Sequence, residues 1–140
     1  MNLNMRTVIC KSVIKNCTLL AAFFIESCAV IQIPSVYERV YEKDDGSIPT
    51  LWKDKLILNQ DSSFSMIKYR YNGSVNNLID SSSTTGTFTI ENSHQHLLIN
   101  LIDSLNNKNY LLTSKGKKLF FSTYSNGKVL RYNPALIKKI

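Results

Sequence analysis

The sequence predicts an all-β domain: an antiparallel meander of about seven to eight strands, closed as a small barrel or stacked as a sandwich, and preceded by an N-terminal signal helix. The chain contains seven Tyr and six Phe, and Asn and Ser separate its short apolar runs. Aromatic residues favour strands, and Asn and Ser favour turns. Ala135 is the only alanine after position 29, whereas a helical bundle normally contains many strong helix formers.

The chain length and the cysteines limit the architecture further. A chain of 140 residues favours a single domain. Its three cysteines, Cys10, Cys17 and Cys28, all precede the predicted β domain. That domain therefore contains no cysteine from which to form a disulfide. The segment after Cys28 is long enough to build a hydrophobic core without such cross-links.

The first 27 residues have the pattern of a signal peptide. Residues 1–16 are basic and contain no acidic residue, and residues 17–25 form an apolar run. The run is too short for a transmembrane helix, which needs ~20 mostly apolar residues. It has the length of the apolar region of a signal peptide.

The end of this segment resembles the lipobox of bacterial lipoproteins. Ile25 stands three residues before Cys28 and the small Ser27 directly before it, as in that motif, whereas Glu26 departs from the motif. The resemblance implies that Cys28 is acylated, with palmitate among its chains, and becomes the first residue of the mature protein. It divides the chain into a signal peptide (1–27), a lipidated tether (28–34) and a β domain (35–140).

The same resemblance implies a location. More than one acyl chain makes anchoring stable, so we expect a lipid-anchored protein of the cell envelope. In this family an aspartate after the cysteine often retains the protein at the inner membrane. Ala29 stands there instead, which implies the outer membrane, facing the periplasm.

Two other interpretations of the leader remain open. Ser27, Cys28 and Ala29 also form the small-x-small pattern of an ordinary signal peptidase site. Cleavage after Ala29 would release a soluble protein that starts at Val30. The third interpretation is a buried N-terminal helix that happens to contain a cysteine.

The first part of the domain contains one ambiguous segment and two predicted strands. Residues 35–41 fit either a short helix capped by Ser35 or a strand. Residues 43–49 contain Asp-Gly and form a loop. We predict strands at residues 55–59 and 63–71, and a polar connection over residues 72–84.

Residues 63–71 place apolar side chains on both faces, which predicts either a bulge or a sheet covered on both sides.

The second part of the domain has the clearest pattern. Residues 85–91 (TGTFTIE) alternate strictly between polar and apolar, as a half-buried strand does. Asn126-Gly127 lies between two apolar runs, which is the strongest short hairpin signal. We expect the last strand to stop at Pro134, followed by an amphipathic tail over residues 135–140. The strands predicted here span residues 85–91, 96–103, 109–113, 118–124 and 128–132.

This pattern resembles the small lipocalin-like β-barrel lipoproteins of the bacterial envelope. The resemblance is carried by Cys28, by KLILNQDSSF, by TGTFTI and by the apolar hairpins after them. It implies a barrel that holds a small apolar ligand. The Gly-x-Trp signature of true lipocalins is missing, because Thr50 precedes the only tryptophan, Trp52, by two positions.

Candidate catalytic and metal-binding residues are weak in this sequence. His94 and His96 are two apart, so on one strand they would point to the same face, and Glu91 or Asp103 would have to complete a metal site. Asn92 and Ser93 favour a solvated turn there instead. No Gly-x-Ser-x-Gly elbow accompanies a Ser-His-Asp set. We therefore predict no catalytic residue, no metal and no cofactor, and we leave the ligand-binding residues unassigned.

The charge distribution indicates a partner. The net charge is +7, and all eight charged residues from Ser104 onward are basic. Such a region suits anionic lipid head groups, while export argues against nucleic acid. We expect a monomeric, non-enzymatic binding or structural module, with a small apolar ligand if it is lipocalin-like. The alternative is a secreted or anchored protein-interaction or inhibitor module that acts through its surface.

Overall fold

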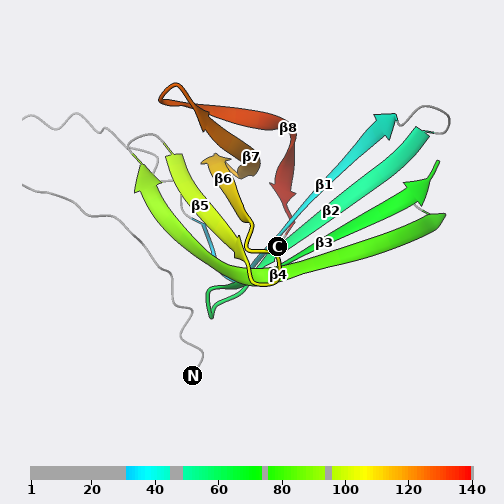
Figure 1. The fold of residues 1–140 in the computed structure, drawn as a ribbon, viewed down its shortest axis with the longest axis horizontal. Coiled ribbons are helices and arrows are strands. Elements are labelled where there is room, and N and C mark those ends of the chain that lie inside the picture. Colours follow the sequence, from blue (N-terminus) through cyan, green and yellow to red (C-terminus); the bar gives the residue numbers. More distant parts are fainter. Residues whose placement is uncertain (1–30, 45–48, 74–75, 94–95, 140) are drawn as a thin grey trace, which may run out of the picture.

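The computed structural model describes residues 31–44, 49–73, 76–93 and 96–139. They fold into eight antiparallel strands that follow one another around a closed barrel (Figure 1). The strands are β1 (Ser35–Asp44), β2 (Pro49–Leu58), β3 (Ser63–Asn72), β4 (Leu78–Ser93), β5 (His96–Asp103), β6 (Asn109–Lys115), β7 (Lys118–Ser125) and β8 (Lys128–Lys138).

This architecture confirms the predicted all-β meander and selects the barrel over the sandwich. Residues 35–41, left open between helix and strand, belong to β1. None of the described residues forms a helix, and accordingly none of them offers a helix able to cross a membrane. The predicted signal helix over residues 1–27 and the lipidation site Cys28 lie outside the described residues.

Strand β4 is longer than predicted. Residues 72–84 were expected to form a polar connection, but β4 begins at Leu78 and runs for 16 residues. Its first half, residues 78–85, is almost entirely exposed, and it pairs only with β3. Ser and Thr can form a strand at such an edge, because no side chain there has to enter a hydrophobic core. The low hydrophobicity of this stretch therefore did not reveal the strand.

Strand β8 also continues beyond its predicted end. Pro134 was expected to stop it, and residues 135–140 to form a tail, yet the strand runs on to Lys138. Proline removes one backbone donor, which is tolerated at a sheet edge or a bulge. The register between β7 and β8 shifts beside it, between Leu119 and Phe121. Beyond the proline, Leu136 is 1% exposed and belongs to the core.

The barrel closes through a short seam between its first and last strands. Only two residue pairs join β1 to β8, Tyr37 with Lys138 and Glu38 with Ile137. One further hydrogen bond, from the Lys139 amide to the Val36 carbonyl, measures 2.8 Å. The strands diverge on the other side of Glu38.

The core fills the barrel around this seam. Most of its members are Leu, Ile, Phe and Met side chains that are nearly inaccessible to solvent. The buried cluster consists of Tyr37, Leu56, Leu58, Phe64, Met66, Phe88, Ile99, Leu101, Leu112, Leu119 and Leu136. Ile31 and Ile33, from the predicted tether, also pack against it. The end of that tether is therefore part of the folded domain.

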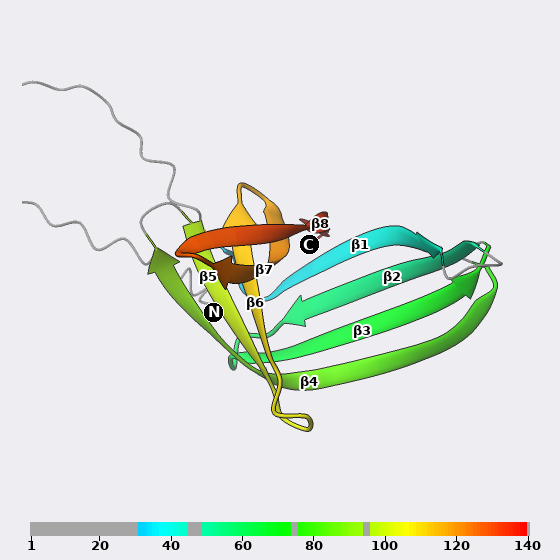
Figure 2. The same ribbon diagram turned by 45° about the horizontal axis from the view of Figure 1, so that its top comes forward.

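Four strands continue beyond the closed barrel as an open sheet, which we call the extension. It consists of residues 39–44 of β1, 49–54 of β2, 68–72 of β3 and 78–85 of β4. Strand β8 pairs with β1 only as far as Glu38, and β5 pairs with β4 only from Gly86 onward. Figure 2 shows β1–β4 reaching away from β5–β8. The extension therefore has two open edges, one on β1 and one on β4.

Candidate functional site

Two rows of polar and aromatic side chains cross the inner face of the extension. The register places cross-strand partners on the same face, and the next row toward the barrel belongs to the apolar core. The outer row is Tyr41, Trp52, Arg70 and Asp80, and the inner row is Arg39, Asp54, Lys68 and Ser82. One continuous sheet face thus changes from a filled apolar core to a polar surface.

The inner row is built around a buried ion pair. Arg39 Nε donates to Asp54 Oδ2 at 2.7 Å, and Arg39 Nη2 contacts the same oxygen. The Asp54 side chain is 0% exposed and that of Arg39 is 13% exposed. The Arg39 guanidinium carbon also lies 4.4 Å from the ring centroid of Phe121, and Nη1 donates to the Pro134 carbonyl at 3.4 Å. Arg39 therefore connects β1 to β7 and β8 where backbone pairing has ended.

The outer row is aromatic and charged. The rings of Tyr41 and Trp52 are stacked, with centroids 6.5 Å apart and planes inclined by 13°. The Arg70 guanidinium carbon lies 5.8 Å from the Trp52 ring centroid, and Arg70 Nη2 donates to Asp80 at 2.6 Å. Burial, together with the nearby Asp54 carboxylate, raises the pKa of Tyr41. Its hydroxyl therefore stays protonated at neutral pH.

Three buried polar atoms on this face have no hydrogen-bond partner among the described residues. They are Trp52 Nε1, Asp54 Oδ1 and Arg70 Nε. An unpaired buried polar group costs about 1–3 kcal/mol. All three atoms are inaccessible to solvent, so a ligand on the surface would not reach them directly. The accessible polar groups of this face belong to side chains such as Arg70 and Asp80.

The predicted histidine site is not assembled by the described residues. His96 is half-buried at the start of β5, and Asp103 lies at the opposite end of the same strand, roughly 24 Å away at ~3.4 Å per residue. No group of three or more His, Cys, Asp or Glu that could hold a metal ion occurs within the described ranges. His94 lies outside them.

Asp103 has a structural role instead. Its carboxylate accepts hydrogen bonds from the Leu105 amide at 2.9 Å and from the Asn106 amide at 3.1 Å. Asn106 Nδ2 also donates to it at 2.9 Å. The Asn106 side chain is the main reason that the pKa of Asp103 is lowered. Asp103 therefore holds the loop between β5 and β6 and is committed to that loop.

Seven of the eight basic residues from Ser104 onward separate into two groups, and the eighth, Arg131, lies within β8. Strands β6, β7 and β8 are antiparallel, so Lys108 and Lys128 lie at the opposite end of these strands from the turn between β6 and β7. Five lysines gather at that turn and at the end of β8, where Lys118 pairs with Ile137. We call this group the basic end: Lys115, Lys117, Lys118, Lys138 and Lys139.

Two lysines of the basic end lie where the chain enters the barrel. Lys138 Nζ donates to Gln32 Oε1 at 2.9 Å. A cavity of about 280 Å³ is lined by Ile31, Gln32, Lys117 and Lys138, among others. Ile31 is only three positions after Cys28, a reach of roughly 10 Å.

Comparisons with known proteins return no match: no family model, no curated protein and no solved structure is significantly similar to this chain. The function must therefore be argued from the residues and their placement.

Sequence reasoning missed the polar rows. The alternation along each strand could have revealed them. Arg39, Asp54 and Lys68 point to the same face of the sheet as the core residues Tyr37, Leu56 and Met66. A charged residue at an alternating position that points to the core face indicates a buried ion pair or a binding site.

Proposed function

We propose that this protein is a lipid-anchored protein of the cell envelope that binds its partner through its surface and has no enzymatic activity. Cys28 would carry the lipid, and the barrel would stand on the outer membrane, facing the periplasm. The partner would bind to the surface of the barrel, and not in a cavity at its centre.

The observation that carries the proposal is the position of the basic end. Lys117 and Lys138 of the basic end line one cavity together with Ile31 and Gln32, the first described residues after the predicted acylation site. An anchor at Cys28 would hold these lysines within roughly a Debye length of the bilayer, ~8 Å at physiological ionic strength. A lysine near an anionic membrane contributes ~1 kcal/mol. Anchor and charge would then act on the same end of the barrel.

The filled core supports surface binding over a lipocalin-like carrier. Nine of the core side chains, among them Phe64, Met66 and Leu112, are 0–1% exposed. They occupy the place where a lipocalin would hold a small apolar ligand. The polar rows of the extension, by contrast, lie beyond the closed barrel, on the continuation of the core face.

The anchor is tested by replacing Cys28 with serine. We expect the wild-type chain to partition into the detergent phase and to sediment with membranes, and the Cys28→Ser variant to lose both properties. Cys17→Ser is the matched control, because it removes a cysteine within the predicted signal peptide, and it should leave partitioning unchanged. Equal partitioning of the wild type and Cys28→Ser would contradict the proposal.

The orientation is tested by reversing two charges at the basic end. In the Cys28→Ser background, Lys115→Glu/Lys117→Glu should reduce affinity for vesicles that contain anionic lipid by at least about 30-fold, at ~1 kcal/mol per lysine. Sedimentation with vesicles measures this affinity. Lys108→Glu/Lys128→Glu changes the net charge equally at the opposite end and should have a much smaller effect. Equal losses in both variants would mean that net charge alone governs binding.

A further inference from the structure

Among the described residues, no strand pairs with the outer edge of β1 along the extension. The Lys139 amide donates to the Val36 carbonyl, so the backbone groups of Val36 point toward β8. Backbone groups of alternate residues point to the same side of a strand, which gives Glu38, Val40 and Glu42 the same direction. Pairing with β8 ends at Glu38. The amides and carbonyls of Val40 and Glu42 therefore face outward, and no strand in the described part of the chain forms a ladder with them.

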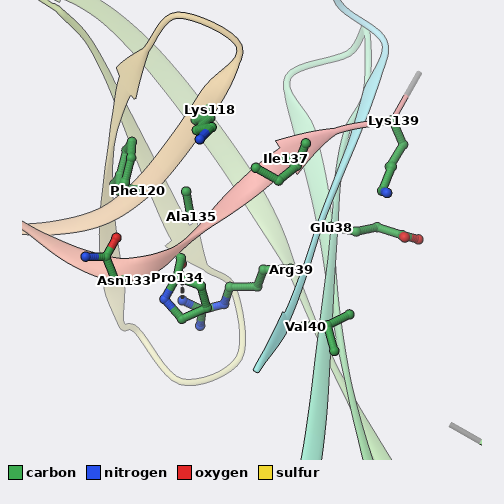
Figure 3. Close-up of a pocket in the computed structure, with 10 residues that line it drawn as sticks. All are labelled: Glu38, Arg39, Val40, Lys118, Phe120, Asn133, Pro134, Ala135, Ile137 and Lys139. Atoms are coloured by element: carbon green, nitrogen blue, oxygen red, sulfur yellow. Dashed lines mark hydrogen bonds between the residues drawn. The ribbon is translucent and has the colours of Figure 1, made fainter. Parts of the chain in front are cut away.

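Strand β8 cannot complete this ladder at Pro134. A proline has no backbone N–H, and its carbonyl accepts from Arg39 instead, at 3.4 Å. Figure 3 shows the Arg39 side chain between β1 and Pro134. Arg39 is fixed in turn by Asp54. The gap between the strands is thus set by a buried ion pair and a proline.

A groove of about 550 Å³ runs along this gap. Its apolar lining includes Val40, which is 50% exposed, and Ile137, which is 40% exposed. Phe120, Pro134 and Ala135 line it from β7 and β8. An open strand edge beside an apolar groove is the arrangement used for strand addition, in which backbone hydrogen bonds give affinity and pockets select side chains.

The charges along the groove select the occupant. Lys118 and Lys139 line it and form no ion pair within the described residues. The single acidic lining residue, Glu38, is already paired with Lys53 at 3.3 Å. The groove therefore presents uncompensated positive charge, which complements acidic side chains.

We propose that the groove between β1 and β8 binds an extended acidic peptide, which adds as a strand to the open edge of β1. Outward-facing residues along one strand repeat every ~6.8 Å, a spacing that an extended backbone matches and a compact small molecule does not. Apolar side chains of the peptide would lie against Val40, Phe120 and Ile137, and its acidic side chains near Lys118 and Lys139. This inference rests on the proposed surface-binding function and names its partner.

The test uses the full-length chain in a neutral detergent and a fluorescent hexapeptide of alternating Glu and Val as the probe. Fluorescence anisotropy should show saturable binding. A hexapeptide of alternating Lys and Val should bind at least about tenfold more weakly, which corresponds to ~1.4 kcal/mol. The acidic peptide with every second amide N-methylated should also lose at least tenfold, because it cannot form the ladder.

Two variants locate the site. Val40→Pro removes an amide that faces the groove and breaks no bond to β2, so it should abolish peptide binding while the far-UV circular dichroism stays unchanged. Lys118→Glu/Lys139→Glu should reverse the preference toward the basic peptide, and it decides the question if the proline variant does not fold. Absence of saturable binding, or equal binding of the N-methylated peptide, would overturn this inference. Membrane partitioning of the same samples reports the anchor separately, so failure of the peptide leaves the proposed anchoring intact.

Discussion

Replacing Arg39 by methionine is expected to lower the free energy of unfolding by about 3–5 kcal/mol, the usual cost of leaving one partner of a buried ion pair alone. Asp54 is 0% exposed, so the variant would leave its carboxyl group without a partner in a nearly dry position. The variant also loses the contacts of Arg39 with Phe121 and Pro134 across the seam. Urea unfolding followed by far-UV circular dichroism measures the loss. Trp52, the only tryptophan, reports separately on the neighbouring outer row.

Two further variants test whether the loss of stability comes from the buried ion pair. Arg39→Met/Asp54→Leu removes both charges and should recover most of the stability, because a well-packed apolar pair can replace a buried ion pair. Lys53→Met breaks the more exposed Lys53–Glu38 pair on the opposite face and should cost at most about 1 kcal/mol. If Arg39→Met cost no more than Lys53→Met, the ion pair would not hold the two strands as described.

Replacing Gly86 by alanine is expected to destabilise the barrel by about 3 kcal/mol or more, at the upper end of overpacking effects. At Gly86 the strand β4 begins to pair with β5, opposite Asp103, while it still pairs with Phe64 of β3. A Cβ there would overlap the backbone oxygen of Ile102 and lie 2.8 Å from Cε1 of Phe64. The first obstacle is backbone, so a change of rotamer cannot relieve it. The two strands would have to separate where the barrel bends.

Gly116→Ala is the matched control for this substitution. Gly116 has φ +59°, and a Cβ there meets nothing within 4 Å, so only the left-handed backbone opposes alanine, at roughly 1–2 kcal/mol. Thermal unfolding of the two variants should therefore rank Gly86→Ala well below Gly116→Ala. A melting temperature of Gly86→Ala equal to that of the wild type would show that β4 and β5 do not approach so closely.

The strands that could be predicted were those specified by local chemistry. The hairpin at Asn126-Gly127 joins β7 and β8 as expected, and the boundaries of β5 agree with the prediction at both ends. Turn residues and strict alternation determine structure over a few neighbouring residues, so a single sequence is enough to recognise them. The first half of β4 and the last residues of β8 were not predicted as strands, because their strand conformation depends on partners elsewhere in the chain.

The polar rows were not predicted because they too depend on contacts between residues that are distant in sequence. Asp54 lies 15 residues from Arg39, and only the register of β1 on β2 brings them together. Whether an inward-facing position lies in the core or on the extension depends on where β8 leaves β1. That point lies between Pro134 and Ile137, which are distant in sequence from β1. The groove along β1 follows from this non-local arrangement.

The proposed anchor is argued from the sequence around Cys28 and from the basic end beside Ile31. Its most direct measurement is the intact mass of the mature chain purified from membranes. The proposal predicts a chain that begins at Cys28 and carries the added mass of several acyl groups. An unmodified chain beginning at Val30, or one that still begins at Met1, would contradict it.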